Sequence, residues 1–577
     1  MKFDDSGDNL VLKLDQAPVS LSYTLKGNGT SNLNGVFKVQ TSANGVDYVD
    51  LAEYATYTLN NKTLTYTLVD LDTEVRYIKW VYTNKDNGNV GLGNIHASIV
   101  YDIYGDLSTA ALDITPDRTC TIYSGATLDI TQMLNNYGTA DDLIIMDGAQ
   151  LKTPNEVRGT IQKIIVGVGQ ENWSTNLGYY LLKSPVPGTF NVDRAIEAGM
   201  LNGTPESPDF DGIDLYEFSQ QNPGEEWQNQ KINESFATFG ITANRGYLYA
   251  NVNNDTLRFA TYSDGESEHL FPATSTEAEV LAIRYSTTTS PFVGWELIGN
   301  PFTCNAYLSS ERDFYRVNTT GDAIVLATEA VIKPCEGIFV VIEEDDPEEW
   351  VTASGTTLAH VHFATTQPQH GPSDHNSLVN INVISNNQVA DVARVRFNNG
   401  GTLGKMILSE SATRLSLAQE GKECSVVRSE AQGELPVNFK AAANGNYTIN
   451  VDVKDTEMGY LHLIDNMTGN DVDLLATPSY TFEAKTTDYA SRFRLVFSAN
   501  NVDENAIEDA FAFISNGEII LNGVNGNTTV QVFDVTGRMI NSTNGANRIA
   551  TDNLTAGVYM LRLINGDNVR TQKIVVK

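Results

Sequence analysis

Short segments in which apolar and polar residues alternate recur along the whole chain. Such alternation places successive side chains on opposite faces of a strand, so that one face can be buried. Clear examples are 63–69, 378–384 and 492–498, and Gly-containing turns, many of them Asn-Gly, separate such segments. A helical pattern is credible only over Val192–Met200, where Asn191 is a suitable N-cap. The pattern predicts an all-β, multi-domain chain of β-sandwich and jelly-roll modules.

Changes in strand length and spacing divide the chain into five predicted modules. The length of 577 residues is sufficient for several domains. Very short strands at close spacing, as in the second module, are typical of the rungs of a parallel β-helix or of a β-rich linker. The modules are a β-sandwich at 1–105, a β-helix-like or linker region at 106–170, a duplicated β unit at 171–363, a second β-sandwich at 364–500 and a small C-terminal sandwich at 506–577.

An internal duplication is predicted for the third module. Three sequence elements occur twice in the same order, with shorter spacing in the second copy. Two matched β units are expected to pack as a pseudo-symmetric pair, each supplying half of a core. The matching segments are 178–186 with 294–302, 214–218 with 313–317, and 244–249 with 334–339.

The first and fourth modules resemble known β folds. Residues 35–42 with 46–48, followed by 76–82 and 88–95, are similar to strands of the galactose-binding-like jelly rolls of Bacteroidetes surface proteins. That resemblance implies either glycan binding or a spacer role. Trp80 and Tyr82 lie two residues apart on one strand face, and we expect them in the core instead of on a sugar-binding surface. Segments 460–465 and 493–497 resemble the immunoglobulin-like module that precedes the sorting domain in secreted Bacteroidetes proteins.

Three motifs in the last module carry a more specific resemblance. They are Val532–Arg538 (VFDVTGR), Leu554–Tyr559 (LTAGVY) and Lys573–Lys577 (KIVVK), in this order. Together they resemble the immunoglobulin-like C-terminal sorting domain of cargo proteins of the Bacteroidetes type IX secretion system. The residues that match the motifs are Val532, Phe533, Asp534, Gly537, Arg538, Ala556, Gly557, Tyr559, Lys573 and Val575.

This resemblance implies a route and two partners. The partners are the type IX secretion machinery and its sorting peptidase, and the route leads across the outer membrane. Removal of the domain is then expected, with release or attachment to a surface glycolipid, so the location is extracellular or on the outer-membrane surface. The polar segment 498–505 has no strand pattern and is the expected place of cleavage, because exposed linkers are cut more readily than strands.

The start of the chain does not match this route. Met1–Asp8 lacks the apolar core of a signal peptide. A protein with a C-terminal sorting domain is expected to carry an N-terminal signal peptide for transport across the inner membrane. We therefore expect this sequence to be the C-terminal part of a longer protein, or a mature or trimmed form.

The charge balance narrows the range of partners. The chain has 72 acidic and 38 basic residues, and its net charge is −34. An acidic surface repels a phosphate backbone, so nucleic-acid binding is disfavoured. Acidic loops are compatible with calcium, but no EF-hand loop is present and no other cofactor is predicted. No apolar run is long enough for a transmembrane segment.

Histidines supply the one candidate metal site. His360 and His362 are two residues apart in a strand-like run, so both are expected to face the same side, where they can hold zinc or copper. His370 and His375, the latter beside Asp374, lie in a segment interrupted by Pro and Gly, where polar residues need no special function. Metal binding is therefore an alternative hypothesis and not the leading one.

The four cysteines do not form a disulfide scaffold in a chain of this length. Cys304 and Cys335 lie in one module, and two interpretations stay open for them. They pair in an oxidising compartment, or they remain buried thiols.

No sequence pattern indicates an active site. The motifs G-x-S-x-G and H-E-x-x-H and the P-loop are absent. The first hypothesis is a non-enzymatic modular β protein that is exported for adhesion or glycan binding, with host surfaces among its targets, or that serves as a stalk. The second is the accessory and export part of a larger secreted hydrolase whose catalytic module lies upstream of Met1.

Overall fold

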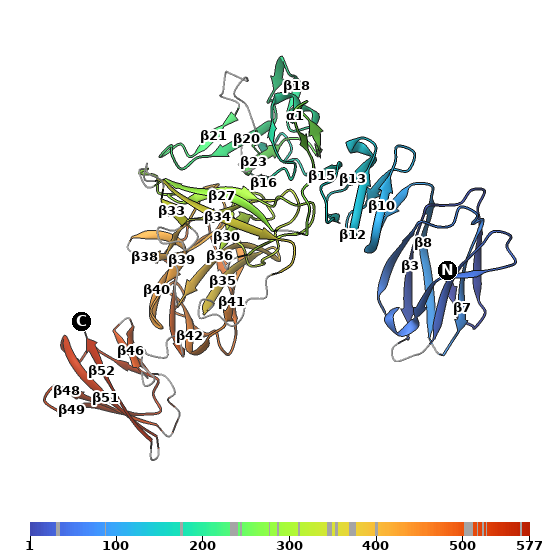
Figure 1. Ribbon diagram of the computed structural model, residues 1–577. Coiled ribbons are helices and arrows are strands. Elements are labelled where there is room, and N and C mark those ends of the chain that lie inside the picture. Colours follow the sequence, from blue (N-terminus) through green and yellow to red (C-terminus); the bar gives the residue numbers. More distant parts are fainter. Residues whose placement is uncertain are drawn as a thin grey trace. The chain divides into compact units, whose positions relative to one another are not determined.

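The computed structural model divides the chain into two compact units. The first comprises residues 1–312 and 329–368, and the second comprises 313–328 and 369–577. Both are built almost entirely from short strands (Figure 1). The structure describes the chain except for residues 31–34, 60, 87, 174–176, 231–240, 243–244, 276, 286–287, 310–311, 343–348, 352–355, 368–376, 398–401, 420, 501–511, 516, 522–523, 525, 527, 566–567 and 577.

The all-β prediction is confirmed. Within the described residues, the single α-helix is α1 (Val192–Glu197), which is accompanied by the 3-10 turns η1 (Thr56–Leu59) and η2 (Ala140–Asp142). The predicted cap is present, because Asn191 Oδ1 accepts a hydrogen bond from the Arg194 amide. The helix ends earlier than predicted, since Gly199 adopts a positive φ of 75° that turns the chain out of the helix.

The N-terminal sandwich consists of two four-stranded antiparallel sheets around one core. Trp80 and Tyr82 are fully buried there, as the sequence predicts, and Tyr23 packs edge-on against Trp80 at 5.7 Å between ring centroids. The first sheet contains, in spatial order, β1 (Lys2–Phe3), β8 (Asn89–Ser98), β3 (Ser20–Asn28) and β6 (Thr63–Val69), and the second contains β2 (Asn9–Lys13), β7 (Tyr77–Asn84), β4 (Val36–Ser42) and β5 (Val49–Ala55).

The next segment coils as a short parallel solenoid. Successive strands alternate between two sheets, and within each sheet they pair in parallel. Ile103, Ile122, Ile145 and Ile161 stand in register and form a buried ladder. One sheet contains β9 (Tyr101–Ile103), β11 (Cys120–Ile122), β13 (Leu143–Ile145) and β15 (Thr160–Ile165), closed by antiparallel β24 (Asp255–Ala260), and the other contains β10 (Leu107–Ile114), β12 (Thr127–Asn136) and β14 (Gln150–Lys152).

Two sets of four strands follow, and their pairing matches. In each set the first strand pairs with the fourth, and the second pairs with the third. This match supports the predicted duplication, which stays a prediction. The first set is β16 (Tyr180–Leu182), β20 (Ile213–Phe218), β21 (Trp227–Asn229) and β23 (Tyr247–Asn251), and the second is β28 (Trp295–Gly299), β30 (Phe314–Val317), β31 (Ile324–Leu326) and β32 (Gly337–Val341).

The remaining strands of the first unit form smaller sheets. Within the described residues they are three two-stranded pairs and one larger antiparallel sheet centred on β34. The pairs are β17 (Thr189–Phe190) with β22 (Ile241–Thr242), β18 (Asn202–Thr204) with β19 (Ser207–Asp209), and β25 (Tyr262–Ser263) with β26 (Glu268–His269); the sheet contains β27 (Ala278–Tyr285), β29 (Tyr307–Leu308), β33 (Glu349–Val351) and β34 (Thr356–Ala364).

The large sandwich of the second unit has one continuous ladder of strands around one core. Strand β38 joins the ladder's two parts, because Arg414–Leu417 pair with β40 while Leu417–Gln419 pair with β39. The strands are β35 (Leu378–Ser385), β36 (Gln388–Arg396), β37 (Leu403–Gly404), β38 (Arg414–Gln419), β39 (Lys422–Arg428), β40 (Gln432–Lys440), β41 (Gly445–Lys454), β42 (Glu457–Asp465), β43 (Asp471–Asp473), β44 (Ser479–Ala484) and β45 (Phe493–Asn500).

One expectation about this sandwich is wrong. Residues 498–500 belong to β45 and not to a strandless linker, because all three continue the pairing with β42 and Ser498 also pairs with β40. Strand pairing uses the backbone N–H and C=O groups, whatever the polarity of the side chains. The polar composition of this segment therefore made the predicted strand end too early. The rest of the expected cleavage segment, 501–505, lies outside the described residues.

The C-terminal module is a small sandwich of two sheets, shown in red in Figure 1. Its core includes Ile519, Val532 and Leu561. Alternation in the sequence predicts strands at 518–521, 529–534, 557–563 and 571–576. All four are confirmed, and the last two are slightly longer in the structure. One sheet contains β46 (Ala512–Ser515), β47 (Glu518–Leu521) and β50 (Arg548–Ala550), and the other contains β49 (Met539–Asn544), β48 (Thr529–Asp534), β51 (Gly557–Asn565) and β52 (Asn568–Val576).

Candidate functional site

The first sorting motif forms a tight turn between β48 and β49 that is organised by Asp534. One carboxylate oxygen accepts hydrogen bonds from the Thr536 amide at 2.9 Å, the Thr536 hydroxyl at 2.6 Å and the Arg538 amide at 3.0 Å. The other accepts from Arg538 Nε at 3.1 Å. Gly537 has φ of 81°, a conformation that side chains disfavour. These contacts, led by that of Thr536, lower the pKa of Asp534 to about 2.

The second motif fixes the start of β51. Tyr559 is buried, and its hydroxyl donates to the Thr555 carbonyl at 2.8 Å. A tyrosine that returns to the backbone a few residues upstream is a known stabilising corner of immunoglobulin-like sandwiches. The preceding sandwich repeats this contact, with Tyr447 donating to the Ala443 carbonyl at 2.8 Å.

The motif residues divide into a buried and an exposed group. Val532 and Tyr559 face the core, and Phe533, Asp534 and Gly557 are half-buried. On β52, the exposed side chains of Lys573 and Val575 alternate with buried Ile574 and Val576. The residues that a partner can reach on the surface are Gly537, Arg538, Ala556, Lys573 and Val575.

Replacing Asp534 by alanine is expected to loosen the turn. Because the folded-state pKa lies below the usual value of 3.8, the stabilising effect is full above about pH 4 and disappears as the pH falls through about 2. Hydrogen exchange of the full chain should show faster exchange at the Gly537 and Arg538 amides in the variant at pH 6. The difference from the wild type should vanish near pH 2, and an equal difference at both pH values would contradict this role.

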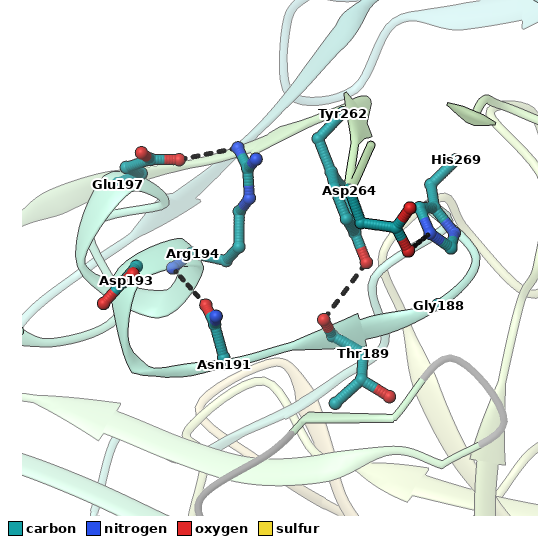
Figure 2. Close-up of a pocket in the computed structure, with 9 residues that line it drawn as sticks. All are labelled: Gly188, Thr189, Asn191, Asp193, Arg194, Glu197, Tyr262, Asp264 and His269. Atoms are coloured by element: carbon teal, nitrogen blue, oxygen red, sulfur yellow. Dashed lines mark hydrogen bonds and ion pairs between the residues drawn. The ribbon is translucent and has the colours of Figure 1, made fainter. Parts of the chain in front are cut away.

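A polar pocket in the first unit lies beside α1, and we call it the α1 pocket. Its volume is about 540 Å³. Figure 2 shows the Tyr262 ring between the Arg194 guanidinium and the His269 ring. The guanidinium lies 4.4 Å from the Tyr262 ring centroid, and the His269 centroid also lies at 4.4 Å. The lining residues are Gly188, Thr189, Asn191, Asp193, Arg194, Glu197, Tyr262, Asp264 and His269.

Hydrogen bonds and ion pairs hold most of this lining in place (Figure 2). Tyr262 donates to the Thr189 carbonyl at 3.1 Å, and Arg194 pairs with Glu197 at 2.8 Å. The contact of Asp264 with His269 Nε2 at 2.9 Å lowers the pKa of that carboxyl, and two backbone amides assist. Within the described part of the chain, the exposed carboxylate of Asp193 makes no hydrogen bond or ion pair. It is thus available to a ligand.

Sequence reasoning identified only one residue of this pocket, the cap Asn191. The lining residues come from two separated segments, 188–197 and 262–269, and no local motif joins them. The contact of Tyr262 with Arg194, which lies 68 positions earlier, depends on the pairing of distant strands. No signal in the sequence could have located the pocket.

The two predicted metal-ligand candidates lie together on β34. The His360 and His362 rings are 6.2 Å apart between centroids, and both are half-buried. A search of the described residues finds no group of three or more His, Cys, Asp or Glu side chains placed to hold a metal ion. The metal site stays a prediction, and His370, Asp374 and His375 lie outside the described residues.

The cysteines are all buried free thiols. Cys120 lies in the solenoid, Cys304 and Cys335 in the middle of the first unit, and Cys424 in the large sandwich. Of the two interpretations that the sequence left open for Cys304 and Cys335, the structure has the unpaired one. Burial raises the pKa of the Cys335 thiol to about 12, which makes it unreactive in the folded state.

Comparison with known proteins identifies the C-terminal module. The family model of the secretion system C-terminal sorting domain matches residues 515–577, which include all three motifs. A comparison with curated proteins gives no match. The module is therefore a protein-sorting domain, and the chain is a secreted protein that is directed by its last module. It is a cargo protein of the type IX secretion system, so its location is the cell surface or the medium.

None of the described helices has the length and apolar character that a membrane-crossing helix requires.

Proposed function

We propose that the exported chain is a non-enzymatic glycan-binding protein of the cell surface or medium, and that the α1 pocket contacts the glycan. The observation that carries this proposal is the combination of a fixed polar lining and the available Asp193 carboxylate in one open pocket. Carboxylate oxygens, amides and a guanidinium supply both acceptors and donors, and sugar hydroxyls require both. Glycan binding at the α1 pocket suits a protein that acts outside the cell.

The charge of the pocket disfavours an anionic ligand. Its lining has three carboxylates, on Asp193, Glu197 and Asp264, and one guanidinium, on Arg194. The net charge of the whole chain, −34, disfavours a polyanionic partner such as a nucleic acid. Calcium-assisted binding is a variant of the same proposal, because acidic side chains suit this ion.

Replacing Asp193 by alanine is expected to weaken glycan binding about tenfold or more, because a hydrogen bond to a charged group is lost. The measurement is a glycan array with the full chain, with and without calcium, followed by titration of the glycans that bind. The matched control is Glu206→Ala, an exposed acidic residue of the β18–β19 hairpin outside the pocket.

Two outcomes would contradict the proposal. An array without saturable binding would favour a stalk, or an accessory part of a larger hydrolase. Equal weakening in the Asp193 and Glu206 variants would indicate a general charge effect. Adhesion to cells would then need another surface of the molecule.

A further inference from the structure

A second pocket, which we call the Glu296 pocket, lies at residues of β20, β21 and β28. Its volume is about 260 Å³, and it shares no lining residue with the α1 pocket. Its charged lining groups are Glu217, Arg245 and Glu296, and the loop 219–222 lines much of the rest. The volume is just below the range of about 300–1,000 Å³ that is usual for drug-sized ligands. The pocket therefore suits a ligand of about one sugar ring and not a chain of them.

Glu296 is a buried carboxyl group with one oxygen left open. Its side chain lies on β28, and the residue is 8% exposed. Oε2 accepts a hydrogen bond from Gln220 Nε2 at 3.2 Å, and within the described residues no donor contacts Oε1. Oε1 is not fully buried, so it is open to the cavity that Glu296 lines. Because Glu296 lines the cavity, a ligand in it can supply the missing donor.

The neighbouring groups hold Glu296 in a fixed position. Gln220 is itself buried, and its Oε1 accepts from the Gly294 amide at 2.7 Å while its Nε2 donates to the Trp295 carbonyl at 3.2 Å. Arg245 forms an ion pair with Glu217 at the pocket. A site that is preorganised in this way loses little conformational entropy on binding.

The mixture of groups selects the chemistry of the ligand. An ammonium ion has only donors, and a carboxylate has only acceptors at neutral pH. The pocket presents acceptors on Glu296 together with donors on Arg245 and on the amides of Gln221 and Asn222. A hydroxyl group is both donor and acceptor, so a ligand with several hydroxyls matches this lining best.

We propose that the Glu296 pocket binds one neutral sugar unit, with a ligand hydroxyl donating to Glu296 Oε1. The site is separate from the glycan contact at the α1 pocket and does not depend on it. If the same kind of sugar binds at both pockets, it contacts different residues in each. Each site is therefore tested by its own variant.

The proposal includes a pH dependence with a defined sign. Burial raises the pKa of Glu296 to about 7, with Glu217 reinforcing the rise and Arg245 and Gln220 opposing it. The group is thus protonated at pH 6 and ionised at pH 8. An ionised carboxylate accepts a hydrogen bond about twice as strong as a neutral one does. The affinity for the sugar should therefore increase about threefold or more from pH 6 to pH 8.

The experiment titrates the full chain with free glucose, galactose, mannose and N-acetylglucosamine at pH 6 and pH 8, by calorimetry or saturation-transfer NMR. At least one sugar should bind saturably, more tightly at pH 8. Glu296→Gln keeps the shape but not the charge, so it should bind at the lower, pH 6 level at both pH values. Glu226→Gln is the matched control, because Glu226 is also 8% exposed, bonds Ser290 and lies outside the pocket lining.

Three results would overturn the proposal. One is the absence of saturable binding of every sugar in the panel. Another is an unchanged pH dependence in Glu296→Gln, or an equal loss in the Glu226→Gln control. The third is tighter binding of methylamine than of any sugar, which would assign the pocket to a cation. The Asp193→Ala variant should bind these single sugars at the Glu296 pocket as the wild type does, which separates this test from that of the α1 pocket.

Discussion

A chain that lacks residues 515–577 is expected to remain inside the cell envelope, with its exported fraction falling to background. These residues contain the matched sorting domain and its turn at Asp534, and a core that spans both sheets of the module. Without this domain, the chain lacks the sorting signal that the secretion machinery recognises. The measurement is immunodetection in the surface, medium and periplasmic fractions of a host that has the type IX system.

The control for this deletion is the full chain with Asp193→Ala, a change in the α1 pocket far along the sequence from the sorting domain. This variant should be exported as the wild type is. If the truncated chain still reached the surface at a normal level, the sorting domain would not be the route by which this protein leaves the cell.

Replacing Lys405 by methionine is expected to lower the free energy of unfolding of the large sandwich by about 3–5 kcal/mol. Lys405 Nζ pairs with Asp391, and the two side chains are 3% and 1% exposed. Asp391 Oδ2 also accepts from the Leu415 amide at 2.7 Å. Burial raises the pKa of Asp391 and Lys405 opposes this, so the variant would leave a buried carboxyl without its cation.

The measurement is denaturant-dependent hydrogen exchange at β36 and β39 in the full chain. Lys440→Met is the matched control, because Lys440 is 40% exposed and lies 3.7 Å from Glu410. That surface pair should contribute less than about 1 kcal/mol. Similar losses in the two variants would show that burial does not set the strength of the Asp391 pair.

Alternation predicted strands of the sorting domain such as β48 because one face of the strand lies in the core of the module. In β48, Val530 and Val532 are buried while their neighbours are not, and the sequence displays that period directly. The burial of Trp80 and Tyr82 in the N-terminal sandwich was predicted from the same alternation. Local patterns suffice where the two faces of a strand have different surroundings.

The parts that the sequence could not predict depend on distant partners. Strand β10 was not expected, because Thr109–Ala111 show no alternation, yet the strand pairs with β12. The buried pair of Asp391 and Lys405 joins positions that have no common motif. Gln220 and Glu296 likewise belong to no common motif. The lining residues of each pocket also come from separated segments, which meet only when the strands pair.

The four buried thiols give this protein a set of built-in reporters. Because each sits in a folded core, a thiol-specific reagent can modify it only when the surrounding structure opens. Cys120 would report opening of the solenoid, Cys304 and Cys335 opening of the middle strands, and Cys424 opening of the large sandwich. Labelling rates resolved by mass spectrometry would therefore give the local stability of three regions in one sample, without any introduced probe.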